Sequence, residues 1–160
     1  MQSKTAVFWQ RAAIAVLPVV FVAVVSSFFT RVGDLWYQTL EKPFFTPPQW
    51  AFPVAWGIVY VCLMASLYLI QRVEGFDAVD LVVPIIAVGA LNIAWSLLFF
   101  GLHLMLPAAL VLLALLGVLM VLLLAARPIC PASAYLLLPH ILWGGFALAL
   151  NVGFWLVNRI

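Results

Sequence analysis

Five long apolar runs, separated by shorter polar stretches, dominate the pattern of the sequence. The runs cover residues 12–30, 52–71, 78–100, 104–126 and 134–158. A helix needs about 20 apolar residues to cross the hydrocarbon core of a membrane, and all five runs have about this length. Because none of them alternates between apolar and polar residues, helices are favoured over the strands of a β-barrel. We therefore predict an all-α integral membrane protein, a five-transmembrane-helix bundle that forms a single domain over residues 1–160.

The connection between the first two runs, residues 31–51, is far longer than a turn requires. It holds Pro43, Pro47 and Pro48 and is rich in aromatic residues. Loops of this length in compact domains are usually functional or disordered, but aromatic side chains favour burial and prolines restrict the unfolded chain. We predict a long ordered loop that forms a lid, with a short helix around residues 34–40.

The composition agrees with a membrane location and excludes some partners. Hydrophobic residues make up 68% of the chain and charged residues 8%, and the mean hydropathy is +1.26, whereas soluble domains have about 25% charged residues. A net charge of +2 argues against nucleic-acid binding. Four of the seven Lys and Arg residues lie on the side of the N-terminus, which favours a cytoplasmic N-terminus. We expect a multi-pass protein of a bacterial cell membrane.

Three of the runs carry aromatic and polar residues on one face. In the second run Phe52, Trp56 and Tyr60 recur at every fourth position and therefore share a helix face. The corresponding faces of the third and fifth runs hold Asn92, Trp95, Ser96 and Phe99, and Trp143, Phe146, Ala147, Leu150 and Asn151. An interfacial belt of Trp and Tyr or hydrogen bonds between helices would explain part of this pattern. The faces nevertheless converge on the lid side of the membrane, which predicts a site for a flat apolar ligand with a polar edge.

Two further features have competing interpretations. His140 lies near the start of the fifth run, where a protein partner is favoured over a metal ion, and no cluster of residues with metal-ligand spacing is evident. Ala87, Ala90 and Ala94 form a small-residue face of the third run, which allows close helix approach. This face serves either a homodimer or packing within the bundle.

Several motifs resemble those of one known family, the TspO/MBR family of tryptophan-rich sensory proteins and translocator proteins, which includes the peripheral benzodiazepine receptor. The lid and second run carry Trp36-Tyr37, Lys42-Pro43, Pro47-Pro48, Phe52-Pro53 and Trp56. Residues 92–101 are similar to the family's third-helix motif, and residues 138–151 are similar to its fifth-helix motif. The resemblance covers nearly the whole chain in the same order.

The resemblance implies a bundle, usually dimeric, that binds tetrapyrroles such as protoporphyrin and haem, and in some members sterols or benzodiazepine-type drugs. We therefore expect a membrane receptor or sensor that requires no cofactor and takes porphyrin, haem or another hydrophobic small molecule as its ligand. The family's pocket lies beneath the first loop. Its lining, carried over to this sequence, would be Trp36, Tyr37, Pro48, Trp56, Asn92, Trp95, Ser96, Trp143, Phe146, Ala147 and Leu150.

Two other functions are alternatives, and the sequence departs from the family pattern at two positions. An enzyme for light- or oxygen-dependent porphyrin breakdown would use Trp36 and Trp143 as redox-active rings, although no acid–base pair supports ordinary catalysis. A transporter of porphyrin or sterol is disfavoured because we expect no charged residue to be buried in the spans. His140 stands where the family often has Tyr. Leu97 stands where it often has Pro, which predicts a straighter third helix.

Overall fold

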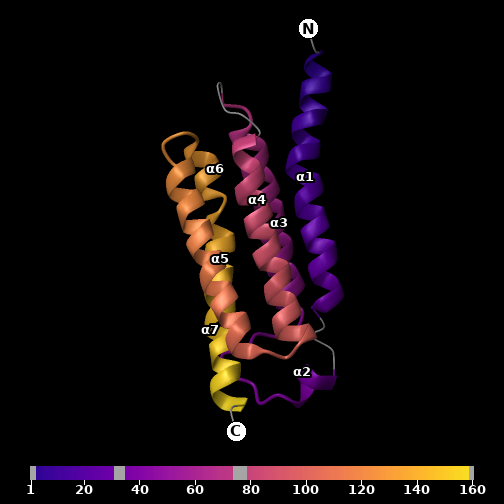
Figure 1. Ribbon diagram of the computed structural model, residues 1–160, viewed down its shortest axis with the longest axis vertical. Helices are drawn as coiled ribbons and strands as arrows, with labels where there is room; N and C mark the ends of the chain where they lie inside the picture. Colours follow the sequence, from indigo (N-terminus) through magenta and orange to yellow (C-terminus); the bar gives the residue numbers. More distant parts are fainter. Residues whose placement is uncertain (1–2, 31–34, 74–78, 159–160) are drawn as a thin grey trace.

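The computed structural model describes residues 3–30, 35–73 and 79–158, and it confirms the all-α membrane fold. Five helical segments are long and apolar enough to cross a membrane (Figure 1). The first four are α1 (Lys4–Phe29), α3 (Ala51–Ile70), α4 (Val79–Ser96) with its continuation η1 (Leu97–Gly101), and α5 (Met105–Ala126). The fifth combines α6 (Pro131–Tyr135) with α7 (Leu138–Asn158). Residues 31–34 of the predicted lid and residue 78 of the predicted third span lie outside the described residues.

Proline residues mark where several of these helices begin. Pro53, Pro107, Pro131 and Pro139 each lie among the first three residues of their helix, where the missing N–H would have no helical partner. Pro139 also explains why the fifth span is not the single helix expected over 134–158. Without an N–H, it cannot donate to the carbonyl of Tyr135, and the helix breaks at residues 136–137.

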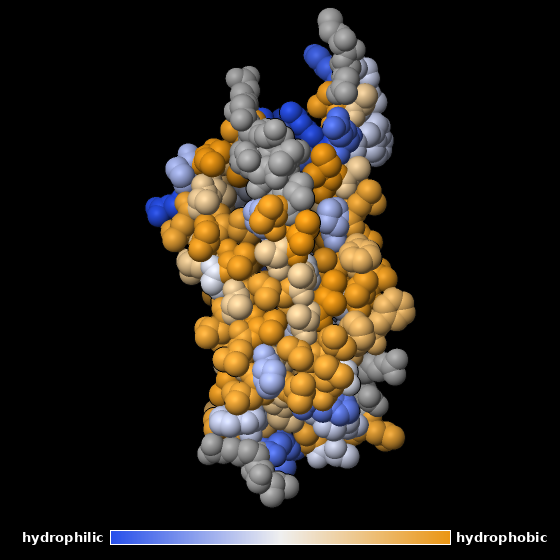
Figure 2. Space-filling view, in the orientation of Figure 1, coloured by the Kyte–Doolittle hydropathy of each residue, from blue (hydrophilic) through white to orange (hydrophobic). Residues whose placement is uncertain are grey.

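Apolar residues cover the outside of the bundle as well as its core. Orange residues extend across the middle of the face in Figure 2, while blue residues gather toward the two ends, as expected for a protein that crosses a bilayer. The core centres on α5, whose Ala108, Leu112, Leu115 and Leu119 are fully buried. This helix packs mainly against α4 and α7.

Helix α1 lies at the edge of the bundle (Figure 1) and contacts α3 and α4. Glycine allows α1 to pack closely against α4, because a Cβ atom at Gly89 would lie 2.7 Å from Cγ2 of Val22. Glycine has a similar role between α5 and α7, where a Cβ atom at Gly144 would lie 3.1 Å from Leu116.

The third span changes its helical form at its end. Residues Leu97–Gly101 form a π-helical turn, in which the N–H of Leu102 donates to the carbonyl of Leu97 at 2.8 Å. The last turn is therefore not a regular α-helix, since a π-turn adds one residue to the helical repeat, and the straighter third helix predicted from Leu97 stays a prediction. One consequence is that both Phe99 and Phe100 are buried together with Trp95.

Candidate ligand-binding site

The described part of the lid begins with α2 (Leu35–Thr39), a short helix close to the predicted range 34–40. Its Tyr37 is only 2% exposed, and the ring lies 5.4 Å from Phe154 and 6.0 Å from Phe100 between centroids. The neighbouring Trp36 stacks on His103 with 4.0 Å between ring centroids and meets the edge of Phe99. Ring contacts of both Trp36 and Tyr37 thus hold helix α2 against the bundle.

The rest of the lid is fastened to the last turns of α7. A Cβ atom at Gly153 would lie 2.9 Å from Cγ of Pro43 and 3.1 Å from Cζ of Phe45, so the lid packs where α7 has no side chain. The Asn158 amide bonds the backbone of Glu41 twice. Its Oδ1 accepts from the Glu41 N–H and its Nδ2 donates to the Glu41 carbonyl, both at 2.9 Å. These contacts set the position of the lid over the bundle.

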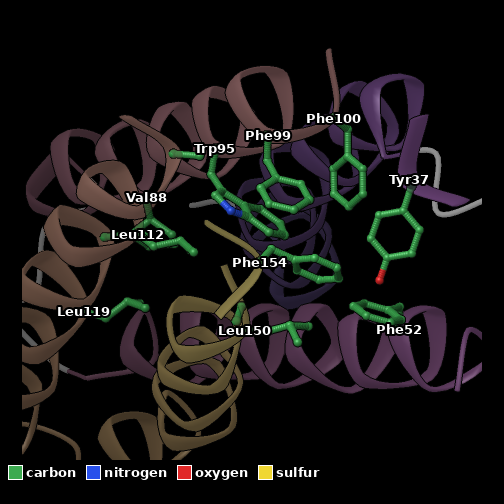
Figure 3. Packing of buried hydrophobic residues seen from close by; sticks show 13 residues of the cluster. Tyr37, Phe52, Val88, Trp95, Phe99, Phe100, Leu112, Leu119, Leu150 and Phe154 are labelled. Atoms are coloured by element: carbon green, nitrogen blue, oxygen red, sulfur yellow. The ribbon is translucent and has the colours of Figure 1, made fainter. Parts of the chain in front are cut away.

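Beneath the lid, aromatic rings from α2, α3, α4, η1 and α7 surround a small cavity, which we call the aromatic cavity. Figure 3 shows Tyr37, Phe52, Phe100 and Phe154 gathered at its lid end, with Trp95 further along α4. Trp95 lies 5.7 Å from Trp56 between ring centroids, and Trp143 lies 5.9 Å from Phe52. The rings fill most of the space, leaving a free volume of about 20 Å³, which is room for a single water molecule.

A larger groove adjoins the aromatic cavity on the side of α1. It has a volume of about 360 Å³, and its polar lining comes from Ser26, Ser27, Thr30, Gln49, Tyr60 and Ser96. Phe52 and Trp56 line both the groove and the aromatic cavity. Small-molecule sites usually enclose roughly 300–1,000 Å³, so the groove reaches this size and the aromatic cavity does not. Movement of Phe52 or Trp56 would join the two spaces.

The buried amides near the site are mostly paired. The indole N–H of Trp95 donates to Oδ1 of Asn151 at 3.2 Å, and Nδ2 of Asn151 donates to the carbonyl of Met105 at 2.8 Å. Asn92 and His140 pair through Nδ2 and Nε2 at 3.2 Å. His140 therefore has a protein partner, as predicted. Burial raises the pKa of Tyr37 to about 12, so its hydroxyl stays protonated at neutral pH.

The structure distributes the eleven predicted lining residues over four places. Seven line the aromatic cavity, and they are Tyr37, Trp56, Trp95, Trp143, Phe146, Ala147 and Leu150. Ser96 lines the groove. Asn92 lies deeper, at an inner cavity of about 60 Å³ that is lined mainly by α1, α3 and α4. Trp36 and Pro48 belong to the lid and are not among the described residues that line these spaces.

Five lining residues of the aromatic cavity are absent from the lining carried over from the family resemblance: Phe52, Phe99, Phe100, Asn151 and Phe154. Helical spacing had placed Phe52, Phe99 and Asn151 on the predicted faces, and Phe154 follows Leu150 by four residues and so shares its face. Phe100 had no such signal. It would turn away from Trp95 in a regular α-helix, and the π-turn brings it to the cavity.

The comparisons with known proteins agree with this architecture. The chain is 34% identical over 145 residues to the tryptophan-rich protein TspO of Archaeoglobus fulgidus, which covers 90% of this chain and 94% of that protein. It is 37% identical over 130 residues to the translocator protein of Ovis aries, covering 79% and 77% of the two chains. It is 28% identical over 124 residues to the tryptophan-rich sensory protein of Cereibacter sphaeroides, covering 74% and 73%. Because residues 14–156 match the TspO/MBR family, and its motifs form the lid and the aromatic cavity, the chain belongs to the TspO/MBR family.

Proposed function

We propose that the protein is a membrane receptor or sensor for tetrapyrroles, protoporphyrin or haem, which bind in the aromatic cavity beneath the lid. The observation that supports this proposal is a closed cluster of rings from three spans, next to a groove that supplies volume. A flat macrocycle gains contact area from ring faces on both sides. Binding would require Phe52 and Trp56 to move, so that the aromatic cavity joins the groove of about 360 Å³.

Titration of the purified protein with protoporphyrin IX, followed by tryptophan fluorescence, tests the proposal. Wild-type protein should be quenched saturably, and Trp56→Ala and Trp143→Ala should each raise the Kd by about tenfold, which corresponds to roughly 1.4 kcal/mol. The Kd rather than the amplitude is compared, because each variant also loses a fluorophore. Trp50→Ala is the matched control, since Trp50 is 68% exposed and lies in the lid away from the cavity. An unchanged Kd in both cavity variants would refute the assignment.

We also propose that the small-residue face of α4 forms a homodimer. Ala90 is exposed, and Ala87 lines a shallow groove between α4 and α5 together with Ala114 and Gly117. Exposed Val83 and Ile86 flank this face. Disulfide formation by Ala90→Cys, in a background without Cys62 and Cys130, should give a dimer in the membrane, and a cysteine at Leu142 on α7 should not. A bacterial cell membrane remains the predicted location.

A further inference from the structure

The inner cavity lies apart from the aromatic cavity and is the larger of the two. It encloses about 60 Å³, against about 20 Å³ for the aromatic cavity, and no described residue lines both. A space of 60 Å³ holds about four water-sized groups. Tyr60 lines both the inner cavity and the groove beside α1, so a molecule that enters from the groove would pass this side chain.

Most of the wall of the inner cavity is aliphatic. Val19 of α1, Leu63 and Ile70 of α3, and Val88 of α4 are typical of it, and no charged side chain is among the described residues that line it. A cluster of about four water molecules would need two to four polar partners for each molecule, which this wall does not offer. The cavity therefore suits a neutral molecule that is mainly apolar.

One polar side chain of the wall, Asn92, has an atom without a partner. Asn92 is 1% exposed, and its Nδ2 pairs with Nε2 of His140 at 3.2 Å, but its Oδ1 has no hydrogen-bond partner in the described part of the chain. Ser66 and Ser133 of the same wall differ, because the hydroxyl of each donates to the other's carbonyl at 2.8 and 2.9 Å. A buried acceptor that lacks a donor loses its hydration without compensation.

Two prolines add further acceptors beside the same space. Pro18 and Pro84 lie inside α1 and α4, and both line the inner cavity. A proline has no N–H, and its ring crowds the carbonyl four residues earlier, which therefore loses its helical donor. These carbonyls and Oδ1 of Asn92 are all acceptors. A molecule that pairs with any of them must donate the hydrogen bond.

We infer that the inner cavity is a second binding site, which takes a small neutral alcohol. Its hydroxyl donates to Oδ1 of Asn92, and a carbon skeleton of about three atoms packs against the aliphatic wall. The inference goes beyond the proposed function, because the two cavities share no described lining residue. It gives the half of the bundle away from the lid a ligand site of its own.

The experiment compares 2-propanol with acetone, which has the same number of heavy atoms and nearly the same shape but no hydrogen-bond donor. The full chain is labelled at its valine, leucine and isoleucine methyl groups, placed in lipid nanodiscs and titrated with each probe by NMR. Val88 is buried in the wall of the inner cavity, so its methyl shifts report binding. Val20 on α1 is 45% exposed and reports probe that is dissolved in the lipid.

In the wild type, 2-propanol should shift Val88 saturably, with a Kd in the low millimolar range that about four heavy atoms can supply. Acetone should bind at least about fivefold more weakly, as expected for one lost hydrogen bond. Ala126→Leu adds three carbon atoms to a residue of the wall and should abolish the saturable shift for both probes. Ala125→Leu is the matched control, because Ala125 is exposed and is not among the described lining residues.

Asn92→Leu removes the acceptor and should bring the Kd for 2-propanol to that for acetone. This variant also deprives His140 of its partner, so thermal unfolding is measured alongside. If it does not fold, the ratio of the two Kd values in the wild type tests the hydrogen bond, and Ala126→Leu tests the location.

Three outcomes would overturn the inference. Equal Kd values for 2-propanol and acetone in the wild type would exclude a donated hydrogen bond. A saturable shift that Ala126→Leu retains as fully as Ala125→Leu would place the probe elsewhere. If Val88 shows no saturable shift at all, no alcohol binds, and magnetisation transfer from water to its methyl groups would identify water as the occupant. None of these results bears on tetrapyrrole binding, which the fluorescence titration measures separately.

Discussion

Two parts of one hydrophobic core differ in what fills them. The stripe on α5, formed by Ala108, Leu112, Leu115 and Leu119, has aliphatic side chains that are fully buried. The aromatic cavity lies beside it and receives no residue from α5. It is built of rings and adjoins an open groove. It also holds two donors without a partner in the described part of the chain, the hydroxyl of Tyr37 and the indole N–H of Trp143. The aliphatic side chains of the α5 stripe pack with maximal contact. The aromatic cavity instead keeps unpaired polar atoms and free space, which stability alone does not require.

This difference assigns two roles that substitutions can separate. Changes in the stripe should affect the stability of the bundle and leave ligand binding intact, and changes around the lid should do the reverse. The following predictions are arranged from the largest expected effect to the smallest.

Leu115→Ala should have the largest effect. Leu115 is 0% exposed, and truncation of a buried leucine typically lowers the free energy of unfolding by about 2–5 kcal/mol. Thermal unfolding in detergent should show this loss. The fraction that remains folded should still bind protoporphyrin with a Kd within about twofold of the wild-type value. Leu113→Ala is the control, because Leu113 is 58% exposed and faces away from the core. A strong loss of binding in Leu115→Ala would mean that the two regions are not separable.

Gly153→Ala should displace the lid. Its new methyl group would lie 2.9 Å from Pro43 and 3.1 Å from Phe45, so the lid must shift, at a cost of about 1–3 kcal/mol. Limited proteolysis should cut the lid faster, and ligand dissociation should accelerate. Gly145→Ala on the same helix provides the comparison, since a methyl group there meets nothing within 4 Å. Equal proteolysis of the two variants would contradict the docking of the lid on Gly153.

Asn158→Ala should loosen the same lid more gently. It removes both hydrogen bonds to the Glu41 backbone, worth roughly 1 kcal/mol each at most in this exposed position. Hydrogen exchange of the Glu41 amide should become faster. Asn158→Asp keeps the acceptor for that amide and loses the amide donor, which bonds the carbonyls of Glu41 and Phe154, so its exchange rate should lie between those of the wild type and Asn158→Ala. Protection that is unchanged in Asn158→Ala would show that other contacts hold the lid.

The smallest effect concerns alkaline stability. Burial raises the pKa of Tyr37 from 10.0 to about 12, so the folded state disfavours the phenolate relative to the unfolded state. The stabilisation by this group is fully present below pH 10 and is lost as the pH rises through about 12. The wild type should therefore lose more thermal stability than Tyr37→Phe between neutral pH and about pH 11. Parallel losses in both proteins would indicate that Tyr37 is not buried.

The sequence predicted the fold well because membrane insertion depends on local properties. The length and hydropathy of each run decide whether a helix spans the bilayer, and the five spans follow from that rule. The helix faces that carry Trp56, Trp95 and Trp143 were predictable from the sequence, because backbone geometry sets which residues of a helix share a face. All three of these residues line the aromatic cavity.

The prediction was less complete where neighbouring helices decide the outcome. Asn92 shares a helix face with Trp95, yet it pairs with His140 at the inner cavity. Phe100 reaches the aromatic cavity only because of the π-turn. Gly153 is an ordinary helix glycine in the sequence, and its role becomes visible only when Pro43 and Phe45 lie against it.

The sequence by itself determined the five spans, the ordered lid and the helix faces that meet beneath it, because hydrophobicity, proline and the helical repeat act within one segment. The tertiary structure decided which polar atoms find partners and how much space the rings leave. Pairing and packing depend on several segments at once, and no single segment contains that information. The unpaired hydroxyl of Tyr37 and indole N–H of Trp143 are the clearest case, since both residues read as plain aromatic lining until their surroundings are known.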